Sequence, residues 1–452
     1  MRKTPLLAAT LALAAGFAAR ADTVEVTSTT FVTAGEQTRY RSGSEPDLVT
    51  VVPAYSILSI TAREVTNPIA DDLRLVVSTW GAYDFADPRW DNGTTSELTG
   101  DVTTGYVQAG FAGRRLTLRL GRTHVMTGVA RMLNVDGGEA IVLLPGGVRI
   151  SGYAGLPVSQ RFASRSGIRS WNPAAGDLAF GGRLGWTLAT PGLAGRGLDL
   201  GASANVVQDG DDPVRQEVGV DLRLQPFART NLTLAGMGAF SLYDERFSEA
   251  NVSLTWSARR RLHLTADWRF TAPDLLLARN SILSVFSSSE WNELGGGVRY
   301  ELGRGLSTGA DYHVRLEPGE EGEDAGNIGH DAAARLDWER SGTSAGLEAS
   351  YLDALDNGYI GTRGYGRRDF GRLSPSLGNV FVSADVLAHF FREAVNGEDF
   401  ALTGTLSAGV ELVRGLSAVV SGRAGVTPYL EQTYDVMAKL VYDRTFRRTE
   451  VR

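Results

Sequence analysis

The segment LHLTADWRF, residues 262 to 270, alternates apolar and polar residues along its whole length. The apolar phase holds Leu262, Leu264, Ala266, Trp268 and Phe270, and the polar phase holds His263, Thr265, Asp267 and Arg269. Successive side chains of a β-strand point to opposite faces, so the segment predicts a strand with one apolar and one charged face. A soluble sandwich would turn the charged face to solvent, whereas a membrane barrel would turn it to a water-filled interior.

The same alternation recurs through most of the chain, in segments of roughly the 9 to 11 residues that a tilted membrane strand requires. Further examples are residues 116–121, 217–224, 298–302, 310–316 and 331–339. Short connections containing Gly or Arg lie at 111–115, 257–261, 302–305, around 341 and at 412–415. Longer polar connections lie between them, at 84–100, 156–175, 271–289, 316–328 and 392–398. Short turns on one rim and long loops on the other are typical of a bacterial outer-membrane barrel.

The first 21 residues have the features of a cleaved secretory signal peptide. Arg2 and Lys3 precede the apolar run LLAATLALAAGFAA, and Ala19-Arg20-Ala21 supplies a small-x-small cleavage site, so the mature chain is expected to begin at Asp22. The alternative is an uncleaved anchor, but the apolar run is shorter than the roughly 20 residues that span a bilayer. Removing residues 1–21 takes away three positive charges and moves the formal net charge from −7 to −10.

Composition excludes several classes of protein. The chain has no cysteine, which excludes a lipid-modified N-terminus, disulfides and thiolate metal sites. It has 54 Gly and 43% hydrophobic residues, which fits neither a disordered chain nor a low-complexity polymer. Acidic and basic residues are interspersed along the chain, which argues against a nucleic-acid partner.

Together these features predict an all-β fold, a single transmembrane antiparallel up-and-down β-barrel of about 18–22 strands with short periplasmic turns and longer extracellular loops. It would occupy residues 22–452, with residues 22–48 as an uncertain first strand or N-terminal segment. An even number of strands is expected, because a spare strand would leave the sheet unclosed. The alternative is a secreted β-sandwich or propeller, against which stand the uniform apolar face and the absence of repeats of blade length.

The pattern resembles the porin-like outer-membrane β-barrels of Gram-negative bacteria, over essentially all of the mature chain. The last strand, residues 431–446, resembles the assembly signal of such proteins, because Tyr434, Val436, Leu440 and Tyr442 share a face with Phe446. It departs from that signal at Arg444 and in the six residues after Phe446. The resemblance implies export through the periplasm to the outer membrane, contact with lipid and lipopolysaccharide, insertion by the barrel-assembly machinery and passage of small solutes. It identifies no solute and no oligomeric state.

If lipid covers the apolar face, the lumen receives charged residues of both signs, because dry burial of so many charges would be prohibitive. The predicted pore-lining residues are Arg119, Asp221, Arg223, His263, Asp267, Arg269, Arg299, Glu301, Asp311, Arg315, Arg335 and Asp337. Arg residues facing Asp and Glu would produce a transverse field that orients charged or zwitterionic solutes. Alternatively, the same pairs only stiffen the wall.

The connection 271–290 is unusually apolar for a loop between long strands. It would hide that surface by folding into the barrel or packing across its mouth, and the candidates for such a constriction or plug are Leu275, Leu277, Arg279, Ile282 and Phe286. Otherwise it extends the neighbouring strands above the membrane. The acidic loop 317–327 and the cluster Asp209, Asp211 and Asp212 would either bind divalent cations or lie free in solvent, and neither has EF-hand spacing.

No catalytic chemistry is expected. The two Gly-x-Ser-x-Gly matches at 305–309 and 342–346 enter strands, whereas a nucleophile elbow leads from a strand into a helix. The five histidines are never spaced as a metal pair, so neither a metal nor another cofactor is predicted. The predicted function is passive diffusion of small hydrophilic solutes. The alternatives are a structural or partner-binding barrel with an occluded lumen and a lipid-active barrel enzyme.

Overall fold

The structure is a computed structural model of the whole chain. It describes residues 21–39, 47–85, 98–130, 133–158, 160–163, 167–170, 177–189, 197–210, 212–226, 231–276, 290–317, 327–353, 357–374, 377–428 and 430–447. The predicted signal peptide lies almost wholly outside these residues, so its cleavage stays a prediction.

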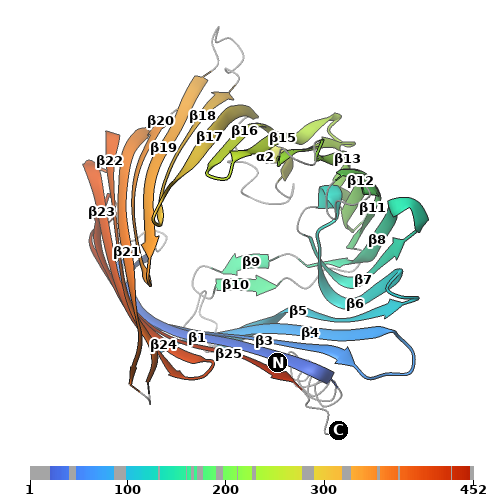
Figure 1. Cartoon of the computed structure of the whole chain (residues 1–452), viewed down its shortest axis with the longest axis horizontal. Coiled ribbons are helices and arrows are strands. Elements are labelled where there is room, and N and C mark those ends of the chain that lie inside the picture. The colour runs from blue at the N-terminus through green and yellow to red at the C-terminus, as the bar shows by residue number, and fades with distance from the viewer. Residues whose placement is uncertain are drawn as a thin grey trace.

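Twenty-two strands close into one antiparallel barrel, seen end-on in Figure 1. The fold class, the even strand number and the range of 18–22 strands are therefore confirmed. In ring order the strands are β1 (Ala21–Arg39), β3 (Pro53–Val65), β4 (Asp72–Asp84), β5 (Leu98–Phe111), β6 (Leu116–Val125), β7 (Leu133–Leu143), β8 (Val148–Pro157), β11 (Leu178–Ala189), β12 (Gly197–Asp209), β13 (Asp212–Leu224), β14 (Leu232–Ser241), β15 (Arg246–Arg259), β16 (Leu262–Thr271), β17 (Trp291–Gly303), β18 (Leu306–Glu317), β19 (Asn327–Arg340), β20 (Thr343–Asp353), β21 (Gly358–Ser374), β22 (Leu377–Val395), β23 (Glu398–Val413), β24 (Leu416–Thr427) and β25 (Leu430–Arg447).

The first and last strands of the chain close the barrel. Strand β1 pairs with β25 from Thr23 opposite Arg447 to Gly35 opposite Asp435, and on its other side it pairs with β3. The short strand β2 (Asp47–Val51) pairs with the far end of β1. The N-terminal segment, uncertain from sequence, is thus the strand that leaves the sheet without an edge.

Tight two-residue turns occur on both rims of the barrel. The turn at Arg304 and Gly305 has φ of +56° and +83°, values that favour the tight primed turns of two-residue hairpins. The prediction of a long connection at 392–398 was wrong, because β22 and β23 extend to a two-residue turn at Asn396 and Gly397, with φ of +53° and +88°. Asn-Gly is the preferred sequence for that turn, so the strands continue up to it.

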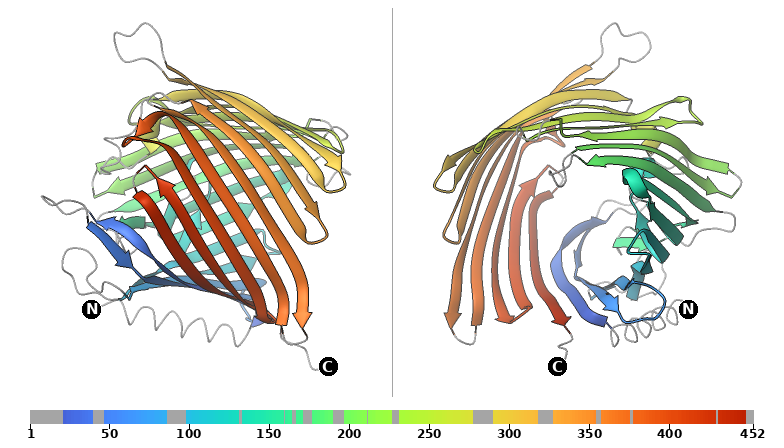
Figure 2. Two further views of the ribbon diagram at one scale, coloured as in Figure 1. Left: turned by 90° about the vertical axis from the view of Figure 1, so that its left-hand side faces the viewer. Right: turned by 45° about the vertical axis from the view of Figure 1, so that its right-hand side comes forward.

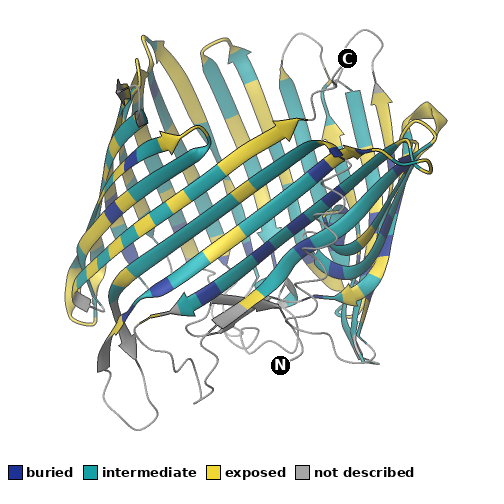
Figure 3. Cartoon of the chain, turned by 90° about the horizontal axis from the view of Figure 1, so that it is seen from below, coloured by how far each residue is buried: buried dark blue, intermediate teal, exposed yellow. Residues whose placement is uncertain are grey.

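The outer face of the barrel is apolar and exposed. Figure 2 shows the tilted strands from the side, and Figure 3 shows exposed residues recurring along them. Large exposed side chains include Trp186, Leu200, Val220, Leu254, Trp268, Leu294, Leu336, Leu347, Leu406 and Val436. Among the described residues, no helix is long and apolar enough to cross a membrane. A closed antiparallel barrel with an apolar exterior leaves no backbone edge exposed to lipid, which is the transmembrane form that the sequence predicts.

In the part of the chain that the structure describes, three short helices and one hairpin lie between the barrel strands. They are η1 (Gly128–Ala130), η2 (Pro145–Gly147), α2 (Pro273–Leu276) and the pair β9 (Gln160–Ala163) with β10 (Gly167–Ser170). The helix η1 packs against β11, β12 and β13, and β10 contacts β5. Both segments therefore contact barrel walls beyond their own neighbours in sequence.

Strand β25 has the position that the assembly-signal resemblance requires, at the seam between β24 and β1. The guanidinium of Arg444, which interrupts the apolar pattern, lies 5.2 Å from the centre of the Phe446 ring. Recognition of this strand by the assembly machinery stays a prediction.

Candidate functional site

Strand β16 turns its charged half to the barrel interior. Trp268 is exposed on the outer face, whereas Asp267 and Arg269 alternate with it on the inner face. The register carries this alternation from strand to strand, because paired residues share a face: His263 lies opposite Arg299. All twelve predicted pore-lining residues fall on this inner face by register. Their role in solute passage stays a prediction.

Inward-facing glycines let polar side chains lie flat along the wall. The His313 ring covers Gly295, where an added β-carbon would lie 2.1 Å from Cδ2 of the ring. Across that glycine, His313 Nε2 is 3.3 Å from Asp267 Oδ1, two strands away. We call such an arrangement a glycine lane, and the described residues form four of them: Tyr153 over Gly181 to Asn205, Arg183 over Gly201 to Asp221, His313 over Gly295 to Asp267, and Tyr365 over Gly346 to Asp337. The lanes keep long side chains on the wall and out of the bore.

The glycine lanes predict that substitution by alanine destabilises the barrel at Gly346 of β20 but not at Gly366 of the neighbouring strand β21. A β-carbon at Gly346 would lie 2.3 Å from Cζ of Tyr365, whereas at Gly366 the nearest atom would be 3.7 Å away, in ordinary contact. We expect Gly346→Ala to displace the Tyr365 ring, break its hydrogen bond to Asp337 and lower the free energy of unfolding by about 1–3 kcal/mol. Gly366→Ala is the matched control, and its unfolding midpoint in denaturant should stay close to wild type. Equal midpoints for the two variants would contradict the lane.

Arg183 contacts two carboxylates at once, Asp199 of β12 and Asp221 of β13. Its Nη2 donates to Asp199 Oδ1 at 2.7 Å and to Asp221 Oδ1 at 2.6 Å, and its Nε donates to Asp221 Oδ2 at 2.9 Å. Thr187 Oγ1 donates to the other oxygen of Asp199 at 2.6 Å. One guanidinium thus neutralises carboxylates from two strands, with the two-oxygen geometry that makes such bonds strong.

The wall formed by β18 to β23 is open to the bore. Arg335 contacts Asp311 at 3.1 Å and Arg363 contacts Asp385 at 2.5 Å. The two arginine side chains nevertheless remain 50% and 47% exposed. Because these residues point inward from a closed sheet, their exposure measures empty, solvent-accessible space inside the barrel.

The wall formed by β11 to β13 is covered. The Val129 N–H of η1 donates to Ser203 Oγ at 3.1 Å, and the Val129 side chain lies over Gly219. Beside this contact Glu217 and Asn205 are only 2% and 1% exposed. Sequence analysis missed this inward connection between β6 and β7, although MTGVARM (126–132) is unusually apolar for a polar-loop position.

The hairpin of β9 and β10 is a second segment within the barrel outline. Its strands pair from Gly167 opposite Ala163 to Ser170 opposite Gln160. In Figure 1 it lies inside the ring of strands, with β10 against β5. The sequence predicts a long connection here, but its candidate for a constriction is 271–290, with extension of the neighbouring strands as the alternative. The hairpin therefore lies beside β5, within the outline of the barrel.

Of the predicted constriction residues, only Leu275 lies among the described residues. It is half-buried in α2, and its N–H donates to the Ala272 carbonyl at 3.1 Å. Leu277, Arg279, Ile282 and Phe286 lie outside the described residues, as does most of the acidic loop 317–327. Whether 271–290 constricts the bore stays a prediction.

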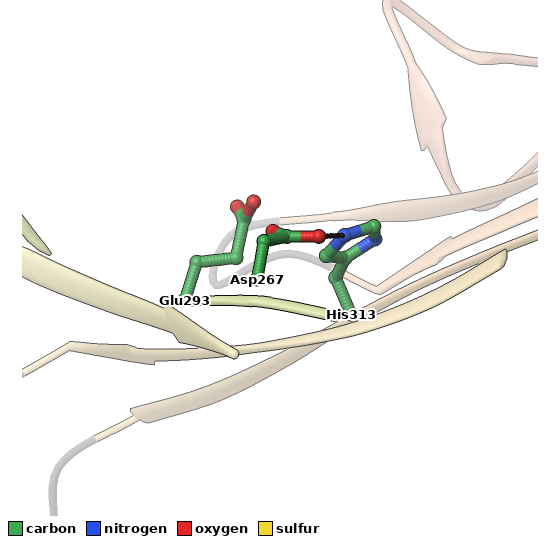
Figure 4. A group of neighbouring side chains, drawn as sticks. All are labelled: Asp267, Glu293 and His313. Atoms are coloured by element: carbon green, nitrogen blue, oxygen red, sulfur yellow. Dashed lines mark hydrogen bonds and ion pairs between the residues drawn. The ribbon is translucent and has the colours of Figure 1, made fainter. Parts of the chain in front are cut away.

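One group of side chains in the described part of the lumen has donors suited to a metal ion. Asp267, Glu293 and His313 come from the adjacent strands β16, β17 and β18, and their ligand atoms all lie within 4.8 Å of one another (Figure 4). Sequence analysis predicts no metal because no two histidines have ligand spacing. The group is assembled instead by the register across three strands.

Comparisons with known proteins find solved structures with a similar fold. No family model matches the chain, and no curated protein matches it. OpdK of Pseudomonas aeruginosa, solved with vanillate, is 8% identical with a TM-score of 0.47, covering 94% of this chain and 98% of its own. OccAB4 of Acinetobacter baumannii is 9% identical with a TM-score of 0.43, covering 94% of this chain and 98% of its own. The translocation pore of the P pilus usher PapC is 12% identical with a TM-score of 0.40, covering 94% and 100%. These values say nothing about what passes through this barrel.

Proposed function

We propose that this protein is an outer-membrane channel for passive diffusion of small hydrophilic solutes, without enzymatic activity. The observation that carries the proposal is the half-exposed state of Arg335 and Arg363 inside a closed barrel. A dry interior would hold such charges only at a cost of several kcal/mol per ion, whereas water in the lumen solvates them. A lumen that contains water along one wall offers a path for solutes.

Two features support a preference for small solutes. The covered wall at η1 and the hairpin of β9 and β10 narrow the bore from one side. The open wall carries cations and anions side by side, as in the pair of Arg335 and Asp311. A dipolar solute such as an amino acid or a short peptide would be oriented by these charges during passage.

The placement of the two Gly-x-Ser-x-Gly matches supports the non-enzymatic part of the proposal. Ser307 and Ser344, the central residues of the two Gly-x-Ser-x-Gly matches, lie in β18 and β20 directly after two-residue turns. Each continues as a strand, whereas the nucleophile elbow requires a helix at that point.

The second candidate is a structural or partner-binding barrel with an occluded lumen. The observation that favours it is the same pair of inward segments, η1 and the hairpin of β9 and β10. The two functions differ in one measurable property, which is whether solutes cross the folded barrel.

Swelling of liposomes that contain the refolded mature barrel tests the proposal. We expect swelling rates to fall steeply with solute size, with fast entry of glycine and arabinose and slow entry of raffinose, because the bore is narrowed. Liposomes with heat-unfolded protein are the control. Failure of every solute to enter, with barrel folding shown by heat-modifiable gel mobility, would replace the channel with the occluded barrel.

A further inference from the structure

We propose that Asp267, Glu293 and His313 form a lumenal binding site for a divalent transition metal ion of the Zn²⁺ class. The site goes beyond the proposed channel function, because binding at equilibrium requires only the folded barrel. It lies on the inner face of β16, β17 and β18, and Figure 4 shows the three side chains gathered above the sheet.

The backbone brings the three ligands together from adjacent strands. Asp267 and His313 both lie opposite Gly295 in the register, from its two sides. Since Gly295 has no side chain, the imidazole crosses it and leaves 3.3 Å between His313 Nε2 and Asp267 Oδ1. Glu293 lies two residues before Gly295 on the same face and brings its carboxylate to within 4.8 Å of both.

The two carboxylates of the group are close enough to share a cation. Two carboxylates in one small group repel each other unless a positive charge lies between them. Arg269 and Arg315 face Glu293 in the register, yet among the described residues no ion pair joins either of them to it. Arg315 instead lies 4.2 Å from the centre of the Trp291 ring and 3.7 Å from Glu317. The Glu293 carboxylate is therefore available to a ligand between the strands.

The donor set determines the class of ion. One imidazole nitrogen and two carboxylate oxygens suit Zn²⁺ and its neighbours, whereas Ca²⁺ and Mg²⁺ prefer oxygen ligands alone. His313 and Asp267 are 21% and 29% exposed to the lumen, so water can fill the remaining coordination positions. Such an open three-ligand site binds reversibly, and the bound ion would neutralise the charge of the two carboxylates.

Isothermal titration of the untagged mature barrel in detergent with ZnCl₂ tests the site. We expect one Zn²⁺ per barrel, with no competition from an equal concentration of CaCl₂. His313→Ala and Asp267→Asn should each weaken binding at least about tenfold, the scale on which metal sites respond to loss of supporting groups. The untagged chain is required because a histidine tag would bind the same ion.

His263→Ala is the matched control. His263 lies on the inner face of the same strand as Asp267, but its Nδ1 is hydrogen-bonded with Ser257 at 2.9 Å, outside the three-residue group. This variant should bind Zn²⁺ like wild type. Absence of binding by wild type, or equal binding by wild type, His313→Ala and Asp267→Asn, would overturn the proposal. Because this titration needs no transport, its result is independent of whether solutes cross the barrel.

Discussion

Deletion of residues 160–170 should raise the single-channel conductance several-fold. The hairpin of β9 and β10 lies within the ring and contacts β5, across the bore from the open wall. Conductance follows the cross-section of the narrowest part of a pore, so removing a two-stranded obstacle from it widens the path for ions. Residues 171–177 remain to connect β8 with β11, so the barrel strands themselves are unchanged.

A loop deletion elsewhere on the same rim separates this effect from general disturbance. Removal of residues 319–324 shortens the connection between β18 and β19. This control deletion should leave the conductance near wild type. Both variants should keep the heat-modifiable mobility of a folded barrel. If the hairpin deletion conducts like wild type, the narrowest point lies elsewhere, with 271–290 the next segment to remove.

Arg183→Ala should lower the stability of the barrel and change its ion selectivity together. It leaves Asp199 and Asp221 without the cation that contacts both at 2.6–2.7 Å. The Arg183 side chain is only 17% exposed, so water compensates for little of the loss, and we expect about 2 kcal/mol lower stability. The two freed carboxylates should also shift the reversal potential in a salt gradient toward cation selectivity.

Arg335→Ala is the comparison variant on the open wall. Its single ion pair with Asp311 is half-exposed, and such pairs contribute about 0–1 kcal/mol. The denaturant midpoint should therefore fall much less than for Arg183→Ala. Equal losses of stability in Arg183→Ala and Arg335→Ala would mean that the covered wall and the open wall are equally solvated.

The barrel itself was predictable because its signal is local. Alternation in LHLTADWRF and its counterparts needs only the two-residue period of a strand, and the outer face of lipid-exposed residues preserves that period throughout the chain. The turn at Asn396 and Gly397 is also specified by a local signal, but the prediction of a long loop overlooked it. The polar residues around it suggested a long loop, but the Asn-Gly pair alone specifies a two-residue hairpin.

The contacts between inward-facing side chains were less predictable, because they depend on the pairing register of neighbouring strands. The placement of His313 over Gly295 toward Asp267 joins residues 46 positions apart through three strands, and nothing in the spacing of either residue along the chain indicates it. The inward segments are a second case. The apolar connection 271–290 had the stronger composition signal, whereas η1 inserts one valine, Val129, over the bare backbone of Gly219. A complementary partner on a distant strand decides such packing.

The proposed channel function requires that water fill a continuous path beside the open wall of β18 to β23. Single-channel recording of the refolded wild-type barrel in a planar bilayer, in symmetric salt, shows whether such a path exists. We expect discrete, long-lived openings whose current is proportional to voltage. Silence from protein that is shown to be folded and inserted would contradict it, and would mean that the space around Arg335 and Arg363 is a closed, water-filled chamber.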